Sequence, residues 1–302
     1  MTTSLAPIVV LSFDRPDYLT TIAESIAAQQ NCQINNREIY LFQDGAINKF
    51  SGNRYAADSD IAACINTFKN ILPQATVINS EWNLGVALNY ERAEQFVFSE
   101  LNASWGLFFE DDLALQANYI KTLEHLGEKF LKDDRVGYIA AYGDHRKSLE
   151  LQEQAKRSLI NLGHFWGFLL YRRHWEKMRP QLQQFLSIVQ ERDYRQRNFD
   201  GKIRDLIRSW GYKSIVDSQD WVKKVITLST GTIGINTLVC YAQYIGRLGL
   251  HMRSEQFEEM GYANTSVFPE WVEDFEELTE AHYKKLLNAA NLNAKLDNSG
   301  IL

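Results

Sequence analysis

Residues 105–115 read WGLFFEDDLAL, and this stretch decides how the rest of the chain is interpreted. Its first part, 105–109, is apolar and bounded by polar residues, which is typical of a buried strand in a parallel sheet. Glu110, Asp111 and Asp112 follow the strand directly. Open α/β sheets bind their ligands at the carboxyl ends of the strands. The three carboxylates are therefore placed where chemistry is expected.

The acidic triplet has two interpretations. Residues two apart on an extended backbone face the same side, so Glu110 and Asp112 would repel each other unless a cation lies between them. Oxygen ligands of this kind suit Mg²⁺ or Mn²⁺. Alternatively, Asp111 or Asp112 caps a helix that begins at once, because apolar residues recur at helical spacing at Leu115, Tyr119, Leu123 and Leu126. The triplet alone does not choose between the two.

Composition narrows the class of protein. A chain of 302 residues with 45% apolar content can bury a sizeable core, in one large domain or two smaller ones. Its net charge of −6 argues against a nucleic-acid partner, because such binding depends on neutralising phosphates. The three cysteines, Cys32, Cys64 and Cys240, lack the paired spacing of a zinc site. We expect buried thiols in a reducing compartment, the cytoplasm.

Membrane insertion is not expected from the sequence. No uninterrupted apolar segment reaches the ~20 residues that span a bilayer. We therefore expect no transmembrane segment, and leave peripheral contact with a membrane open. Arg192, Arg195, Arg197 and Lys202 could face an anionic lipid-linked acceptor, but neighbouring acids favour a solvated helical face over residues 191–210.

Strand and helix patterns alternate over the first 130 residues, which predicts an α/β fold with a doubly wound, mostly parallel sheet. The predicted strands are 7–13, 38–42, 75–78, 105–109 and 136–141. The helices between them are a face beginning at Tyr18, a helix over 59–72, one from the 81–89 region to about 100, and one from Asp112 to about 131.

The second half is less regular. Residues 163–171 mix glycines with aromatics, which suits a strand or loop where a ligand approaches the backbone. A helix is predicted from near Arg173 past Pro180, and a charged amphipathic helix over 270–291. Glycines also mark the stretches 230–236 and 246–251.

Four short motifs stand in order: FDRP at 13–16, FQDGA at 42–46, NLGVALN at 83–89 and FFEDDL at 108–113. This set resembles glycosyltransferases of the GT-A fold, and within that fold the N-acetylglucosaminyltransferase I-like group. Members of that group carry a DRS or DRP turn after the first strand, a QD pair after the second, and an EDD triplet as their variant of the DxD metal motif. The resemblance covers roughly residues 7–255.

Three later segments extend the resemblance. GHFWGFLL at 163–170 is similar to the family's glycine- and tryptophan-bearing segment after the sheet. Asp220-Trp221 falls where the family places its acceptor-activating Asp, although Gln219 stands where relatives often have a tryptophan. GRLGLH at 246–251 resembles the loop that closes over the donor, although Met252-Arg253 follows it where many relatives keep small residues.

The resemblance implies a role for seven residues. Asp112 would bind the divalent metal, Mn²⁺ or Mg²⁺, that bridges the donor's diphosphate, and Asp220 would be the general base. Glu110 and Asp111 would contact metal-bound water or the donor's sugar and ribose. The other donor contacts would come from Asp44 at the uracil edge, Arg15 at the nucleotide, and His251 near the diphosphate or the metal.

The implied activity is a metal-dependent, inverting transfer of a hexose or N-acetylhexosamine from a nucleotide sugar, UDP-linked above others, in polysaccharide biosynthesis. The acceptor would be a hydroxyl of a glycan or glycolipid. The implied organisation is a nucleotide-sugar-binding α/β half over 1–142, an acceptor-binding and catalytic half over 143–260, and a C-terminal helix and tail over 261–302.

Each assignment has an alternative. Asp44 could be only a turn former beside Gly45, and Arg15 could only pair with Asp17 on the surface. Asp220 could be an ordinary exposed helix acid. For the whole chain, one rival is a nucleotide-sugar or glycan binding module without catalysis. A nucleotidyltransferase comes third, because FDRPDYL offers one Arg and no glycine for a phosphate loop.

Overall fold

A computed structural model describes residues 5–249 and 252–295, and eight of their strands form the central sheet. Its order is β3-β2-β1-β4-β8-β6-β9-β7. The strand bounds are β1 Ile8–Ser12, β2 Ile39–Gln43, β3 Thr76–Asn79, β4 Trp105–Glu110, β6 Val136–Ala140, β7 Leu159–Asn161, β8 Gly167–Tyr171 and β9 Ile233–Thr237. Four of the seven pairings are parallel, and β8 runs antiparallel to both of its neighbours. The predicted α/β fold with a mostly parallel sheet is confirmed.

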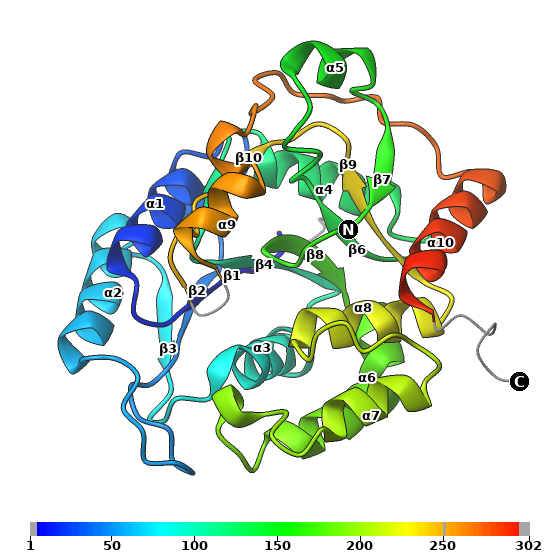
Figure 1. The fold of residues 1–302 in the computed structure, drawn as a ribbon. Helices are drawn as coiled ribbons and strands as arrows, with labels where there is room; N and C mark the ends of the chain where they lie inside the picture. Colours follow the sequence, from blue (N-terminus) through cyan, green and yellow to red (C-terminus); the bar gives the residue numbers. More distant parts are fainter. Residues whose placement is uncertain (1–4, 250–251, 296–302) are drawn as a thin grey trace, which may run out of the picture.

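Helices cover both faces of this sheet (Figure 1). Their bounds are α1 Pro16–Ala27, α2 Asp58–Ile71, α3 Gly85–Gln95, α4 Tyr119–Lys129, α5 Leu149–Gln154, α6 Arg172–Val189, α7 Lys202–Ser209, α8 Gln219–Ser229, α9 Ser254–Glu259 and α10 Glu280–Ala294. Helices α1, α2 and α4 pack on one face, and α3, α6, α7 and α8 on the other. The sheet is therefore wound on both sides, as predicted.

Alternation along the central strands divides the core into two layers. In β4, Leu107 and Phe109 join the core under α1 and α4, while Phe108 joins the core on the opposite face. The period of two in a strand makes successive side chains point to opposite faces. A strand buried on both sides must be apolar at every position, which explains the continuous run at 105–109.

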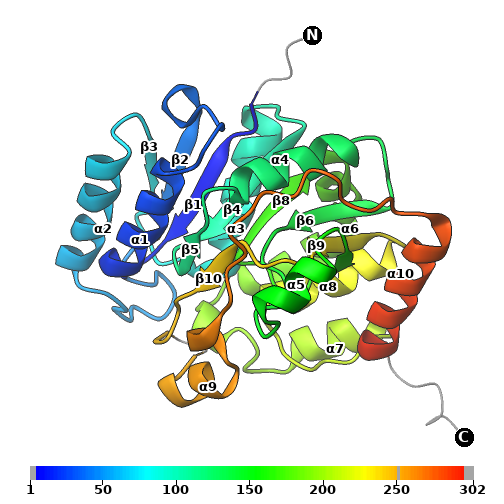
Figure 2. The ribbon, with the colours of Figure 1, turned by 90° about the horizontal axis from the view of Figure 1, so that it is seen from above.

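The register of the parallel strands sets where the acids lie. Leu11 of β1 is opposite Glu110 of β4, and Ser12 is opposite Gln43 of β2. The segment that follows β1 therefore begins beside the acidic residues that follow β4. Strand β8 runs the other way, and the Trp166 carbonyl before it accepts a hydrogen bond of 2.7 Å from the Glu110 amide. Figure 2 shows these strands side by side from above.

The prediction of a helix directly after Asp112 is wrong. Leu113–Leu115 form a short strand, β5, which pairs antiparallel with β10, Ala242–Tyr244. Helix α4 begins only at Tyr119, so neither Asp111 nor Asp112 caps it. Leu113 and Leu115 are buried and Ala114 is half-buried, which is the period of a strand. The partner strand lies more than 120 residues away, so local spacing could not reveal it.

Two predicted helices in the second half also differ from the structure. Residues 191–210 form a 3₁₀ turn, Tyr194–Gln196, and then α7, with Gly201 at φ 73° between them. The final helix begins at Glu280 and not at 270. An irregular segment before this helix covers the core with the buried side chains of Phe268, Phe275 and Leu278. Their spacing resembles that of a helix. In the described part of the chain, none of the helices has both the length and the apolar character of a membrane span.

Phe108 should be a strong determinant of stability, because its ring is fully buried at the centre of the sheet and stacks on Phe168. We expect Phe108→Ala to lower the free energy of unfolding by about 3–5 kcal/mol, through lost transfer energy and the cavity left behind. Urea denaturation measures this. Phe199→Ala, at a side chain that is 92% exposed, is the control and should change it by less than about 0.5 kcal/mol. Equal losses in the two variants would contradict the assignment of the core.

Candidate active site

Arg15 is the cation that holds the acids after β4 together. Its Nε donates to Asp111 Oδ2 at 3.2 Å, and its Nη2 donates to Asp111 Oδ1 and, at 3.1 Å, to Asp112 Oδ2. Both carboxylates are only 4% exposed. A buried carboxylate is costly unless it is paired, so Arg15 is what makes this arrangement stable. The surface pairing of Arg15 with Asp17, considered from the sequence, is not the arrangement found.

Asp112 keeps one oxygen free. Its Oδ1 is buried and has no hydrogen-bond partner among the residues the structure describes. Burial raises the pKa of this carboxyl to about 6, while the Arg15 guanidinium acts in the opposite direction. A buried acceptor without a donor calls for an explanation, and a bound ion or water is one of them.

The loop over 245–249 lies against these acids. The Ile245 amide donates to the Asp112 carbonyl at 2.9 Å, and the Leu248 amide donates to the Tyr18 hydroxyl at 3.2 Å. A Cβ added at Gly246 would come within 2.4 Å of the Tyr244 hydroxyl and 2.7 Å of Asp112 Oδ2. Only glycine fits this close approach. His251, predicted to lie near the diphosphate or the metal, is outside the described residues.

The acids fit a divalent cation that takes few protein ligands. Within residues 5–249 and 252–295, no group of three or more His, Cys, Asp or Glu side chains could hold a metal by itself. Mg²⁺ is commonly held by one or two carboxylates and completed by waters and substrate phosphates. The free Oδ1 of Asp112 fits that mode, and Arg15 occupies the other oxygen.

The negative charge of Asp220 acts on the carboxyl group of Glu110. Burial raises the pKa of Glu110 well above its usual range, and the charges of Asp112 and Asp220 raise it further. Glu110 Oε1 lies 3.3 Å from the Tyr90 hydroxyl. Asp220 comes from the first turn of α8, so the fold brings together acids that are 110 positions apart in the chain. The sequence-predicted residues Arg15, Glu110, Asp111, Asp112 and Asp220 thus gather in one region.

Asp220 is held at a well-defined helix start. Ser218 caps α8 by accepting a hydrogen bond from the Trp221 amide, and the Gln219 side chain donates to Asp220 Oδ1. Burial raises the pKa of the Asp220 carboxyl to about 6, and the charge of Lys223 acts against this rise. A carboxylate in such a position is suited to accept a proton near neutral pH.

Asp44 has a different setting from the other acids. Its two oxygens accept hydrogen bonds from the amides of Gly45, Leu84 and Gly85 at 2.8–3.0 Å and from Asn83 Nδ2 at 3.2 Å. Four donors match the four lone-pair sites of a carboxylate. Asp44 therefore ties the start of α3 to the end of β2, whereas the structural role considered from the sequence was only that of a turn former beside Gly45. The contact with a uracil edge stays a prediction, and these hydrogen bonds give it no free acceptor.

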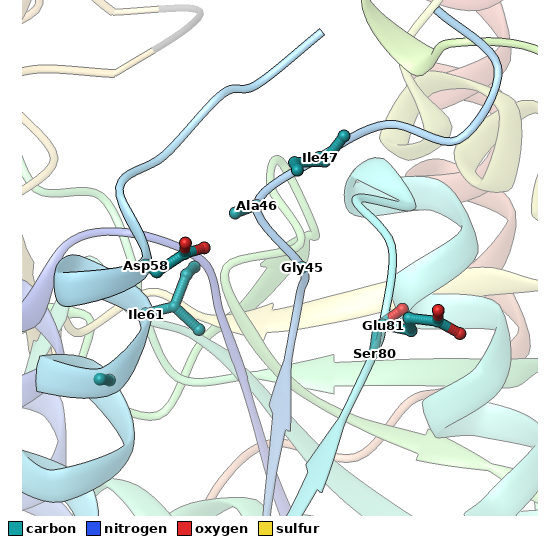
Figure 3. A pocket seen from close by; sticks show the side chains of 8 residues that line it. Gly45, Ala46, Ile47, Asp58, Ile61, Ser80 and Glu81 are labelled. Carbon is teal, nitrogen blue, oxygen red and sulfur yellow. The ribbon is translucent and has the colours of Figure 1, made fainter. Parts of the chain in front are cut away.

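A cavity of about 260 Å³ lies beside Asp44, beyond the carboxyl ends of β2 and β3. Figure 3 shows the chain after β2 running between the side chains of α2 and the residues that follow β3. The lining is mainly apolar with a few polar groups, from Gly45, Ala46, Ile47, Asp58, Ile61, Ala62, Ser80 and Glu81. The motif FQDGA pointed to this edge, whereas the contribution of α2 depends on helix packing that the motifs do not encode.

Aromatic rings border the acids on the side of β8 and β10. Trp166 stacks on Tyr244 with ring centroids 4.1 Å apart and planes inclined by 18°. Burial raises the pKa of Tyr244, and the charges of Asp112 and Glu110 raise it further. Tyr244 was not predicted as a site residue. The only signal for it in the sequence was its position two residues before the glycine-rich loop.

Comparison with known proteins finds no matching family model and no matching curated protein. Among solved structures, the chain is similar to mannosyltransferase PcManGT from Pyrobaculum calidifontis in complex with GDP-Man and Mn²⁺, with 13% identity and a TM-score of 0.44 over 78% of this chain and 56% of that one. It is similar to S. aureus TarS 1-349, with 13% identity and a TM-score of 0.43 over 95% and 70%. Galactosyltransferase LgtC, in complex with donor and acceptor sugar analogs, gives 12% and 0.36 over 88% and 98%.

The chain thus spans little more than half the length of the mannosyltransferase. All three likenesses are distant. They do not assign an activity.

Removing the Asp44 carboxylate separates its two roles. Asp44→Ala leaves the buried donors at the start of α3 without an acceptor, so we expect the free energy of unfolding to fall by about 2–4 kcal/mol. Asp58→Ala, at an exposed acid in the first turn of α2, is the control and should cost less than about 1 kcal/mol. Denaturant unfolding measures both. Unchanged stability of Asp44→Ala would contradict the capping role and return Asp44 to a contact with the ligand.

Proposed function

We propose that this chain is a metal-dependent, inverting glycosyltransferase that moves a sugar from a nucleotide sugar to a hydroxyl of a glycan or glycolipid. The observation that carries the proposal is the buried Oδ1 of Asp112, which has no partner within residues 5–249 and 252–295, inside a cluster that also contains Arg15, Glu110 and Asp220. The cluster combines one place for a cation, one fixed guanidinium and one separate carboxylate. Those are the parts that transfer from a nucleoside diphosphate sugar requires. The ordered motifs of the sequence support the same assignment.

The donor's diphosphate would lie between Arg15 and the loop over 245–249. Departure of the nucleoside diphosphate builds up negative charge, and a divalent ion held by Asp112 supplies a Lewis acid that neutralises it. Arg15 adds a fixed positive charge beside the same oxygens, and its planar fork suits a phosphate as well as a carboxylate. The loop shields this region from water, which strengthens every charge interaction within it.

Asp220 would serve as the base. It accepts the proton of the acceptor hydroxyl while that oxygen attacks the anomeric carbon on the face opposite the leaving diphosphate. One carboxylate in this place requires no covalent intermediate, so the configuration inverts, as in inverting hydrolases with a sugar hydroxyl in the place of water. Glu110, held by Tyr90, lies between the cation site and the base and is suited to contact the transferred sugar.

The cavity between β2 and α2 is suited to the nucleoside. Its apolar walls, Ala46, Ile47 and Ile61, offer surface to a base, and Ser80, Asp58 and Glu81 offer polar contacts. A pocket with apolar walls and a few polar groups is the usual form of a small-molecule site. We propose a UDP-sugar as donor, with a hexose or an N-acetylhexosamine as the group transferred.

A binding module without transfer is the second candidate. Arg15 supports it, because its guanidinium already provides a cationic partner for Asp111 and Asp112. Such a module would bind a nucleotide sugar or glycan and leave Asp220 without a catalytic role. Donor binding and sugar transfer, measured separately, distinguish the two candidates.

Binding of the donor nucleotide should depend on Asp112. We expect UDP with Mn²⁺ to raise the thermal stability, by about 2.7 kcal/mol at 100 times the dissociation constant, because the ligand binds only the folded state. GDP, CMP and dTDP, each with and without Mn²⁺, test the choice of base. In Asp112→Asn the Mn²⁺-dependent part should disappear, whereas it should persist in Asp134→Asn, at an acid that is 89% exposed and does not line the cavity. A full Mn²⁺-dependent shift in Asp112→Asn would contradict the metal assignment.

Transfer should depend on Asp220 while donor binding should not. We expect Asp220→Asn to lower kcat for transfer from UDP-sugars by about 10²–10⁴, the usual contribution of a positioned base. The nucleotide-induced stabilisation should stay the same, because Asp220 lies away from the diphosphate. A panel of UDP-hexoses and UDP-N-acetylhexosamines with oligosaccharide acceptors measures transfer. Unreduced transfer in Asp220→Asn would assign the base elsewhere.

A further inference from the structure

A buried ion pair joins helix α8, which carries the candidate base Asp220, to helix α3. Lys223 Nζ is 2.5 Å from Glu94 Oε1, and the side chains are 3% and 0% exposed. Lys223 stands three residues after Asp220 on α8, on the same side of the helix, and Glu94 belongs to α3. Replacing a buried ion pair by apolar residues is often neutral or stabilising. This pair therefore calls for an explanation other than stability.

The surroundings of the pair lead to the site. Lys223 Nζ lies 4.6 Å from the centre of the Tyr90 ring, and the Tyr90 hydroxyl lies 3.3 Å from Glu110 Oε1 and 3.1 Å from the Phe165 carbonyl oxygen. Glu94 Oε2 is buried and has no partner within the described ranges. Lys223 is thus one cation among three acids, Glu94, Asp220 and Glu110. The positive charge of Lys223 therefore acts both on Glu94, its ion-pair partner, and on Asp220 in the candidate active site.

We propose that Lys223 is a positioning residue for Asp220: it keeps this carboxylate ionised and anchors the start of α8, while Glu94 fixes Lys223 in place and moderates its charge. The inference rests on the proposed function, in which Asp220 is the base. Lys223 acts through Asp220, and nothing places it in contact with a substrate.

The groups around Asp220 determine the direction of the effect. The groups that interact with it electrostatically are Lys223 on its own helix, Tyr90 of α3, Glu110 of β4, Tyr138 of β6 and Tyr194 of the turn before α7, while Glu94 of α3 pairs with Lys223. Lys223 is the cation among them, and the others are anionic or neutral. Removing its charge leaves burial and neighbouring acids to disfavour the carboxylate, so the pKa of Asp220 must rise. Neutralising Glu94 leaves the charge of Lys223 uncompensated, so the same pKa must fall.

The test follows the charge of Asp220 directly. A carboxyl ¹³C titration of the aspartates in the full chain, with the Asp220 signal assigned by its loss in Asp220→Asn, reports the pKa without any activity. We expect Lys223→Met to raise it by about one pH unit or more and Glu94→Gln to lower it. Lys223→Arg keeps the charge and should stay near the wild type. Lys224→Met, at the next position and with a half-buried side chain, is the matched control and should leave it unchanged.

The pH profile of transfer provides the second readout. In Lys223→Met the acid limb of kcat/KM should move to higher pH, because a base whose pKa rises by one pH unit from about 6 is mostly protonated at pH 6. Transfer at pH 6 should then fall about fivefold or more and recover largely at pH 8.5. In Glu94→Gln the limb should move down. A purely structural pair would lower activity equally at every pH and leave both limbs where they are, and that result would overturn the proposal.

Failure of the two hypotheses can be told apart. If Lys223→Met does not fold, Glu94→Gln retains the lysine and carries the test with the opposite sign, and an unmoved titration of Asp220 in that variant overturns the proposal. If the titration moves as expected but Asp220→Asn transfers sugar at the wild-type rate, the coupling of Lys223 to Asp220 stands and the assignment of the base falls. If Asp220→Asn is inactive and the titration does not move, the reverse holds.

Discussion

The removal of water from the carboxylates after β4 is the constraint on which the site depends. Strand β4 lies at the centre of the sheet with helices on both faces, so the acids at its end emerge into a region that is largely dry. Asp111 and Asp112 are held there by Arg15, whose own position is set by the parallel register of β1 and β4. Buried charge must be paired or completed by a ligand, and one oxygen of Asp112 is left for the second option.

Two sets of opposite charges surround this point. Arg15 pairs with Asp111 and Asp112. Lys223 pairs with Glu94, and its charge also acts on Asp220, which in turn acts on Glu110. Each cation lies beside more acids than it can neutralise, so the site keeps an excess of negative charge. A divalent cation would offset that excess, and a separate carboxylate would remain free to accept a proton.

Asp44 and Asp220 have different roles although both are aspartates, because different groups surround them at the starts of their helices. Asp44 accepts four hydrogen bonds and joins β2 to α3, so its carboxylate has a structural role. Asp220 accepts one hydrogen bond from its neighbour Gln219 and is half-buried in the first turn of α8. Environment and not residue type thus separates a structural acid from a candidate base.

The sequence by itself determined the alternation of strands and helices, the burial of β4 on both faces, and the placement of Glu110, Asp111 and Asp112 at a ligand-binding edge. These features follow from periodicity and from the order of polar and apolar residues, which are local properties of the chain. Motif order also singled out Arg15 and Asp220 before any geometry was known.

Only the tertiary structure decided which of these residues meet. Arg15 pairs with acids 96 and 97 residues away, Lys223 with Glu94 at 129, and β5 with β10 across more than 120. It also decided that Asp44 is a cap, that α4 begins at Tyr119, and that α2 lines the cavity beside β2. Such contacts depend on strand order and helix packing over the whole chain. Side-chain periodicity specifies which face is buried, but not which distant residue covers it.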